Sequence, residues 1–224
     1  MKAIVSLCRK NPYFFLLFMV WIVLGGLLIV VFGKEHLFLA INQAHAPALD
    51  LFFPLYTNVG DAVLFILLLL FLLWRRNFKS FIPGLIILLC MAIVVQLVKH
   101  RFHAPRPIAY FDHSSMVHTI TWVKVHGTNS FPSGHTACAF SLCSFIALLL
   151  PNKKLGITLF FVALLAGYSR IYLAQHFFED VYIGSIIGTL SSLLVCWLFE
   201  LVRLKQATPE TAPVPTLVPA TDLN

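Results

Sequence analysis

The sequence predicts an all-α integral membrane protein, a bundle of six transmembrane helices with both termini in the cytoplasm. Of its 224 residues, 59% are hydrophobic and 11% are charged, whereas a soluble domain carries about 25% charged residues. Six stretches also approach the roughly 20 apolar residues that cross a bilayer. The basic residues, finally, gather in alternate connections between these stretches. The length suits one membrane domain over residues 1–205, followed by a tail.

The predicted spans are 13–32, 55–74, 81–98, 134–150, 155–173 and 181–202. The first is longer than the apolar core of a signal peptide and no small-residue cleavage site follows it, so we expect it to be retained. The segment after it is interrupted by Pro47 and Pro54, which argues against a crossing. Residues 36–44 could form a short interfacial helix or an ordinary loop.

Ten of the sixteen basic residues fall on one side of this layout, which should therefore be cytoplasmic. They are Lys2, Arg9, Lys10, Arg75, Arg76, Lys79, Lys153, Lys154, Arg203 and Lys205. All nine histidines fall on the other side. This asymmetry indicates that chemistry selected the histidines of the outer face.

The remaining composition excludes other classes of protein. The net charge of +7 reflects topology in a membrane chain, so we expect no nucleic-acid partner. None of the five cysteines has a metal-binding spacing, and all lie in or beside apolar runs, which is typical of small buried hydrophobes. Residues 206–224 are rich in Pro, Thr and Ala and are predicted to be a disordered cytoplasmic tail.

Two polar clusters lie at outer ends of the predicted spans. The stretch KHRFHAPRP carries Lys99 and Arg106, for which headgroup anchoring is the simpler explanation when it is taken alone. The stretch NSFPSGHTACAF predicts a helix start, in which Ser133 caps and Gly134 lets a backbone N–H approach a ligand. His135 stands at the mouth of that potential anion site. A capped helix whose histidine bonds locally is the alternative.

The third cluster, SRIYLAQHFFED, places Arg170, His176 and Asp180 between two apolar runs. If 176–180 is helical, His176 and Asp180 share a face, and the carboxylate can fix the tautomer of the ring and raise its basicity. Glu179 is expected to be an interfacial charge. Together the three clusters place three cations at one depth without matching acids, an arrangement that a phosphate group would neutralise.

These residues resemble the three signature motifs of the type 2 phosphatidic acid phosphatases. The matching patterns are Lys99-x6-Arg106-Pro107, Pro132-Ser133-Gly134-His135 and Ser169-Arg170-x5-His176-x3-Asp180. The resemblance implies that His176 attacks phosphorus, that Asp180 orients it, and that His135 protonates the leaving oxygen and then activates water. It also implies that the phosphate is bound by Lys99, Arg106, Ser133, Gly134 and Arg170, with no metal or other cofactor.

The resemblance implies a lipid phosphate substrate, met at the periplasmic face of the inner membrane. Candidates are undecaprenyl diphosphate, phosphatidylglycerol phosphate, phosphatidate and lipid A. The sequence slightly favours the diphosphate, because His113, His118, Lys124 and His126 in loop 108–131 could hold a second phosphate, unless they are merely solvated. The motifs also resemble vanadium haloperoxidases, which are soluble. A transporter or a non-catalytic lipid-binding protein on the same bundle is the alternative from another class.

Overall fold

The computed structural model describes residues 7–112 and 115–207, without the side chains of 204–207. Its described part is all-α. The elements are α2 (Pro12–Asn42), α3 (Pro47–Tyr56), the 3₁₀ turn η1 (Thr57–Gly60), α4 (Ala62–Trp74), α5 (Phe78–Phe102), α6 (Pro107–Tyr110), α7 (Gly134–Leu149), α8 (Leu155–Tyr172) and α9 (Phe178–Ala207). Most of the predicted tail, 208–224, lies outside the described residues, as do Lys2 and His113.

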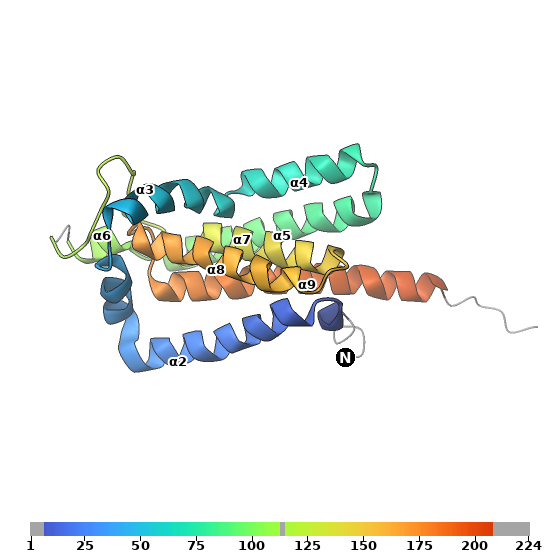
Figure 1. Ribbon diagram of the computed structural model, residues 1–224, viewed down its shortest axis with the longest axis horizontal. Helices are drawn as coiled ribbons and strands as arrows, with labels where there is room; N and C mark the ends of the chain where they lie inside the picture. The colour runs from blue at the N-terminus through green and yellow to red at the C-terminus, as the bar shows by residue number, and fades with distance from the viewer. Residues whose placement is uncertain (1–6, 113–114, 208–224) are drawn as a thin grey trace, which may run out of the picture.

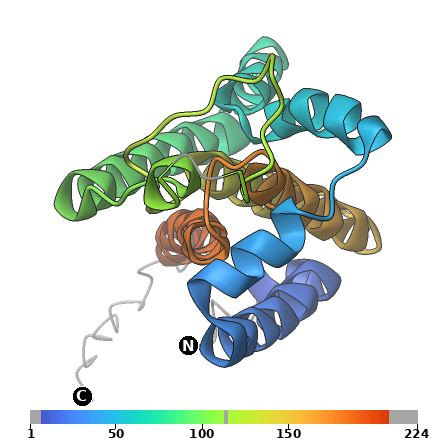
Figure 2. The ribbon, with the colours of Figure 1, turned by 90° about the vertical axis from the view of Figure 1, so that its left-hand side faces the viewer.

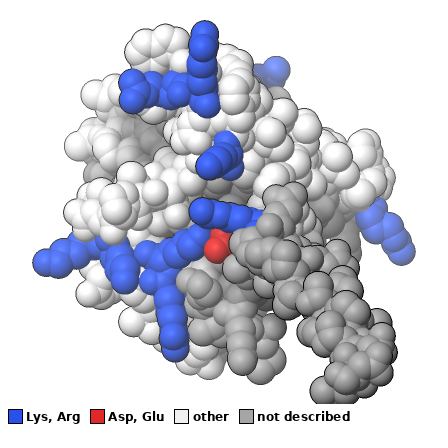
Figure 3. All heavy atoms as spheres, turned by 90° about the vertical axis from the view of Figure 1, so that its right-hand side faces the viewer, with Lys and Arg blue, Asp and Glu red and all other residues white. Residues whose placement is uncertain are grey.

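The long helices run along the long axis of the molecule (Figure 1). Helix α2 begins and α9 ends at one end of the bundle, and the turns that join α4 to α5 and α7 to α8 lie at the same end. Lys and Arg side chains surround this end (Figure 3). The opposite end carries α3, α6 and the turn between α8 and α9, and the last part of α2 crosses it (Figure 2).

The bend in α2 occurs at Gly33, whose φ of 71° and ψ of 173° interrupt the helical conformation. Glycine adopts this region without steric cost. Residues 12–32 therefore form one helical part and residues 34–42 a second, so of the two alternatives for 36–44 a helix forms, as far as Asn42. Helix α3 begins with Pro47 in its first turn and includes Pro54, which extends helical structure upstream of the second predicted span.

Within the described residues, four helical segments are long and apolar enough to span a membrane: α2, α5 continued through α6 to Tyr110, α8, and α9 as far as Arg203. The pair formed by 47–60 and α4, bent by 46°, makes a possible fifth. The prediction of six is thus supported only as four to five candidate spans, because α7 has 16 residues. Every residue of α7 from 136 to 145 is buried, and α7 packs against α9, α8 and α5. Protein surrounds this helix, so its length is not tied to a bilayer.

Large apolar side chains are distributed as in a membrane protein. Val30 of α2 is 84% exposed and Leu97 of α5 is 65% exposed, whereas the interior holds buried serines and threonines along α7 and α9. Apolar clusters join α4, α5, α7 and α9 on one side and α2, α7 and α8 on the other. This pattern leaves hydrocarbon as the natural surroundings of the outer helix faces.

Close packing of α7 against α9 depends on two glycines of α9. A Cβ at Gly184 would lie 2.6 Å from the Ser133 carbonyl oxygen, and one at Gly188 would lie 2.2 Å from the Ala137 carbonyl oxygen. Small residues allow helix backbones to approach in this way. The approach also brings the start of α9 beside the start of α7.

Replacing Gly188 with alanine is expected to separate α7 from α9 and to destabilise the protein by about 1–3 kcal/mol, the usual cost of overpacking. A lower Tm in detergent, measured by intrinsic fluorescence, checks this result. Gly127→Ala is the control, since its Cβ would make only an ordinary 3.6 Å contact. An unchanged Tm in Gly188→Ala would contradict the prediction.

Candidate active site

The turn between α8 and α9 folds back over the end of α8. Ala174 adopts a φ of 53°, and the amides of Gln175 and His176 donate to the Arg170 carbonyl oxygen at 2.9 and 3.1 Å. His176 is thereby held beside Arg170, ahead of α9, which begins at Phe178. The helix supposed for 176–180 therefore starts two residues later, although the contact that it was expected to make is present.

His176 is 1% exposed and faces Asp180 of α9. Its Nδ1 lies 3.4 Å from Asp180 Oδ2 and 3.5 Å from the Ser130 hydroxyl. Asp180 Oδ2 also accepts from that hydroxyl at 2.5 Å and from the Phe177 amide at 2.8 Å. The carboxylate is thus fixed by two donors, and the histidine ring is held on its Nδ1 side.

Charge around His176 is strongly positive. Burial, followed by the positive charges of Arg106, Arg170 and Lys99, holds the pKa of His176 well below its usual value. The imidazole is therefore neutral across the physiological range, which is the form that can act as a nucleophile.

Two arginines approach the histidine from different elements. Arg106, which precedes α6, is 9% exposed; its Nε donates to the Thr128 carbonyl oxygen at 2.8 Å and its Nη1 to Gln175 Oε1 at 2.7 Å. Arg170 is 8% exposed, and its Nη1 donates to Thr57 Oγ1 at 2.8 Å. Its buried Nε has no hydrogen-bond partner among the described residues.

Lys99, in the last turn of α5, is partly buried. Within the described ranges, neither Lys99 nor either arginine forms an ion pair with a carboxylate. Buried charges normally have such partners, because desolvation without compensation is costly. The cluster therefore has the electrostatic character of an anion site with donor groups still to be used.

The start of α7 forms the remaining side of the cluster. Ser133 is the N-cap, accepts from the Thr136 amide at 3.4 Å and donates its own amide to the Asp180 carbonyl oxygen at 3.0 Å, so the predicted cap is confirmed. A Cβ at Gly134 would make only a 3.6 Å contact, so packing does not require glycine there. His135 Nε2 contacts Asp61 Oδ1 at 2.8 Å.

The structure thus brings together all eight residues singled out from the three motifs. It adds Ser130, Gln175, Thr57 and Asp61, which the sequence analysis missed. Ser130 stands inside a stretch already singled out, and Gln175 adjoins His176. Their positions in the sequence could therefore have identified them as site residues. Nothing in the spacing of Thr57 and Asp61 marked them.

Some residues of loop 108–131 lie beside the polar cluster and others lie away from it. The Lys124 carbonyl oxygen accepts from Gln175 Nε2 at 2.9 Å, which ties this loop to the cluster. Slight desolvation and the positive charges of Arg106 and Lys124 lower the pKa of the exposed His126, so His126 lies within reach of the cations. His118 instead bonds to Asp50 at 2.9 Å, away from the cluster.

One group of possible metal ligands is present although the sequence suggested none. His45, Asp50 and His118 place their ligand atoms within 4.8 Å of one another. The two rings are stacked in parallel, 3.8 Å apart, and Asp50 Oδ1 accepts from the Tyr172 hydroxyl at 2.5 Å. Parallel rings direct their lone pairs past a shared ion, so this geometry is that of a polar contact between α3 and the loop.

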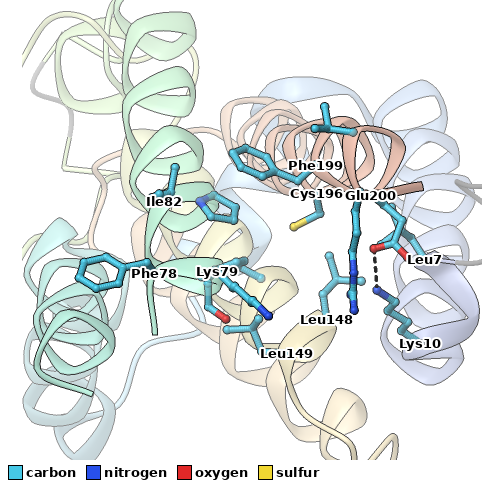
Figure 4. A pocket seen from close by; sticks show the side chains of 15 residues that line it. Leu7, Lys10, Phe78, Lys79, Ile82, Leu148, Leu149, Cys196, Phe199 and Glu200 are labelled. Atoms are coloured by element: carbon cyan, nitrogen blue, oxygen red, sulfur yellow. Dashed lines mark hydrogen bonds and ion pairs between the residues drawn. The ribbon is translucent and has the colours of Figure 1, made fainter. Parts of the chain in front are cut away.

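A hollow of about 710 Å³ lies at the other end of the bundle, between α5, α7 and α9. Phe78, Lys79, Cys196, Phe199 and Glu200 line it together with Lys10 (Figure 4). Lys10 pairs with Glu200 at 3.4 Å. None of the eight predicted site residues contributes to it, so its size gives no information about the polar cluster.

Comparison with known proteins shows which family this chain resembles. The sequence pattern of the PAP2 superfamily matches residues 80–203. The chain is 32% identical over 161 residues to the lipid A 4′-phosphatase of Porphyromonas gingivalis, covering 69% of this chain and 68% of that protein. It is 33% identical over 96 residues to the undecaprenyl-diphosphatase BcrC of Bacillus subtilis, covering 42% of this chain and 45% of that one.

A crystal structure shares the fold over most of the chain. The PAP2-type phosphatidylglycerolphosphate phosphatase of Bacillus subtilis superposes with a TM-score of 0.60 at 25% identity, covering 90% of this chain and 98% of that one. The likeness therefore extends over the membrane helices as well as the motifs.

Proposed function

This chain belongs to the PAP2 superfamily and is a membrane lipid phosphate phosphatase, and from this premise we propose that it works through a phosphohistidine at His176. One observation carries the proposal. A buried neutral histidine, held on Nδ1 by Asp180, faces three cations that have no carboxylate partner. A phosphoryl group would supply the missing negative charge at the atom that the histidine attacks.

In the first step, Nε2 of His176 attacks phosphorus while the bond to the lipid oxygen breaks. Asp180 stabilises the imidazolium character that develops on the ring. His135 gives a proton to the leaving oxygen. Lys99, Arg106 and Arg170 stabilise the three non-bridging oxygens, and the free Arg170 Nε is a donor ready for one of them.

In the second step, water attacks phosphorus, His135 takes a proton from that water, and the bond between phosphorus and Nε2 breaks. Phosphate leaves, and His176 returns to its neutral form. The Gly134 amide and the Ser133 hydroxyl at the start of α7 add donors to the oxyanion. Because the cations supply the electrostatic stabilisation that a metal gives elsewhere, we propose that the reaction needs no metal.

For the substrate, a phosphorylated glycolipid of the lipid A type and undecaprenyl diphosphate are the two candidates. The first is favoured by the relative matched over two thirds of both chains. The second is favoured by Lys124, which adds a positive charge beside His126 and beyond the three cations and suits a second phosphate. Phosphatidylglycerol phosphate and phosphatidate complete the panel.

We further propose six crossings, one membrane domain over residues 1–205, and both termini in the cytoplasm, with the site at the periplasmic face of the inner membrane. The support is the ring of Lys and Arg around the end where α2 begins (Figure 3), which favours that end as cytoplasmic. The polar cluster lies at the opposite end, beside α6 and the turn between α8 and α9.

Detergent-purified protein is expected to release phosphate from at least one of these four lipids with EDTA present. Sealed right-side-out vesicles supplied with the same lipid from outside test the orientation. A transporter or lipid-binding protein on this bundle would release no phosphate in detergent, and loss of activity in EDTA would overturn the metal-free mechanism. Comparable kcat/KM on prenyl diphosphate and lipid A would show that the site recognises only the phosphate group of its substrate.

A further inference from the structure

The short turn η1 and the residue after it contact the proposed site from outside the three motifs. Thr57 Oγ1, at the start of the turn, accepts from Arg170 Nη1 at 2.8 Å. Asp61, directly after the turn, contacts His135 Nε2 at 2.8 Å. One segment of five residues thus reaches both a phosphate-binding cation and the proposed general acid.

This approach depends on Gly60. A Cβ at Gly60 would lie 2.8 Å from the His135 carbonyl oxygen and 3.0 Å from the His135 Cβ. Because glycine lacks that atom, the turn lies directly against the first turn of α7. Gly60 itself is buried, so the contact belongs to the packed interior of the bundle.

Asp61 stands at the start of a helix, but its side chain does not cap that helix. It is the N-cap of α4, with φ −75° and ψ 147°, yet its side chain makes no capping hydrogen bond. Aspartate is favoured at N-caps because it accepts from the free amides of the first turn. Here the carboxylate forgoes those amides and contacts the imidazole instead.

The positive charges around His135 make an adjacent carboxylate important for the protonation of its ring. Burial acts first against a protonated His135, and the positive surroundings made by Arg170 from α8, His176 from the turn before α9, Lys99 from α5 and Arg106 act in the same direction. An adjacent carboxylate favours the protonated ring, and a general acid must carry its proton before the leaving oxygen departs.

We propose that the turn Thr57–Asp61 is a fourth segment of the catalytic apparatus, in which Asp61 orients His135 and stabilises its protonated form and Thr57 positions Arg170. The inference rests on the proposed phosphatase mechanism. With Nε2 engaged by Asp61, Nδ1 is the nitrogen that hands its proton to the lipid oxygen as the phosphorus–oxygen bond breaks. His135 is then neutral and takes a proton from the attacking water, which restores the imidazolium beside Asp61.

Asp61→Asn tests this role, because the amide keeps the shape of the side chain and removes its charge. On a lipid phosphate, whose alkoxide needs a proton to leave, kcat is expected to fall about 10- to 100-fold. On p-nitrophenyl phosphate, whose phenolate leaves unprotonated, the fall should be much smaller. Equal losses on both substrates would reduce Asp61 to a structural residue, and no loss on the lipid would overturn the proposal.

The dependence of kcat on pH with the lipid substrate gives a second readout. If the protein does not hydrolyse p-nitrophenyl phosphate, this readout alone tests the role of Asp61. Without the carboxylate the ring loses its proton at lower pH, so the alkaline limb of kcat should move to lower pH in Asp61→Asn. Glu35→Gln is the matched control, since Glu35 is an acid of α2 that accepts from the Tyr110 hydroxyl at 2.7 Å. An unmoved limb in Asp61→Asn contradicts the role.

Thr57 is tested by a conservative pair. Thr57→Val removes the oxygen that holds Arg170 and should raise KM and lower kcat, whereas Thr57→Ser keeps that oxygen and should retain wild-type values. Equal behaviour of the two variants would reject the positioning role. If the wild type itself released no phosphate from any lipid, the phosphatase mechanism would fail; an active wild type with unaffected variants would refute only the fourth segment.

Discussion

Replacing His176 with alanine is expected to lower kcat/KM for lipid phosphate hydrolysis by at least about 10⁴-fold, since the covalent step loses its nucleophile. No other described histidine faces Asp180. The neutral state of His176, set by burial and by the cations beside it, which lower its pKa, makes it the group able to attack. Phosphate release from detergent-purified protein measures the loss.

The fold should survive this change. The His176 ring makes only long contacts at Nδ1, of 3.4 and 3.5 Å, and Asp180 keeps its bonds to Ser130 and to the Phe177 amide. The control is His126→Ala, an exposed histidine of the loop, which should retain most activity on a monophosphate. Base-stable, acid-labile phosphate on the rapidly quenched wild type, absent from His176→Ala, would identify the intermediate. Near-normal turnover by His176→Ala would refute the mechanism.

Arg170→Met is expected to lower kcat/KM about 10²- to 10³-fold, the usual cost of removing an oxyanion donor, and to raise the Tm of the phosphate-free protein. The guanidinium is 8% exposed, its Nε has no partner in the described part of the chain, and Thr57 is its hydrogen-bond acceptor. An apolar side chain of similar length relieves that desolvation and the repulsion from Arg106 and Lys99.

The paired measurement distinguishes function from folding. Activity and thermal unfolding are followed on the same detergent preparation, with and without inorganic phosphate. Phosphate should stabilise the wild type more than Arg170→Met, because the anion supplies the charge that the cluster lacks. Arg101→Met, which replaces an exposed arginine in the last turn of α5, should change neither quantity. A Tm that falls together with activity would show that Arg170 stabilises the empty site.

Most helices could be predicted from the sequence because apolar length is a local property. Two features of the helices could not be read from apolar length. The break at Gly33 depends on a single φ of 71°, which hydropathy does not report. The segment predicted as the fourth span forms the helix α7, but its apolar surface is covered by α9, α8 and α5, which a hydropathy profile does not report. Lipid-facing and protein-facing apolar residues look alike in a sequence.

The candidate site was partly predictable for a similar reason. The motifs identify residues whose chemistry stands out in hydrocarbon, so Lys99, Arg106 and Arg170 could be grouped without coordinates. Thr57 and Asp61 could not, because their roles depend on contacts with residues 113 and 74 positions away. A polar residue beside an apolar helix is common, and only the packed bundle shows which one meets an arginine or a histidine.

The site is assembled from the segments 57–61, 99–106, 130–135 and 170–180, and this dispersal has a consequence for biosynthesis. Asp180 belongs to the first turn of the last long helix, and its carbonyl oxygen accepts from the Ser133 amide only when α9 has docked on α7. A chain leaves the ribosome from its N-terminus, so Lys99 and Arg106 emerge well before His176 and Asp180. A nascent or truncated chain that lacks α9 is therefore expected to have no phosphatase activity, and hydrolysis is expected to begin only when insertion is complete.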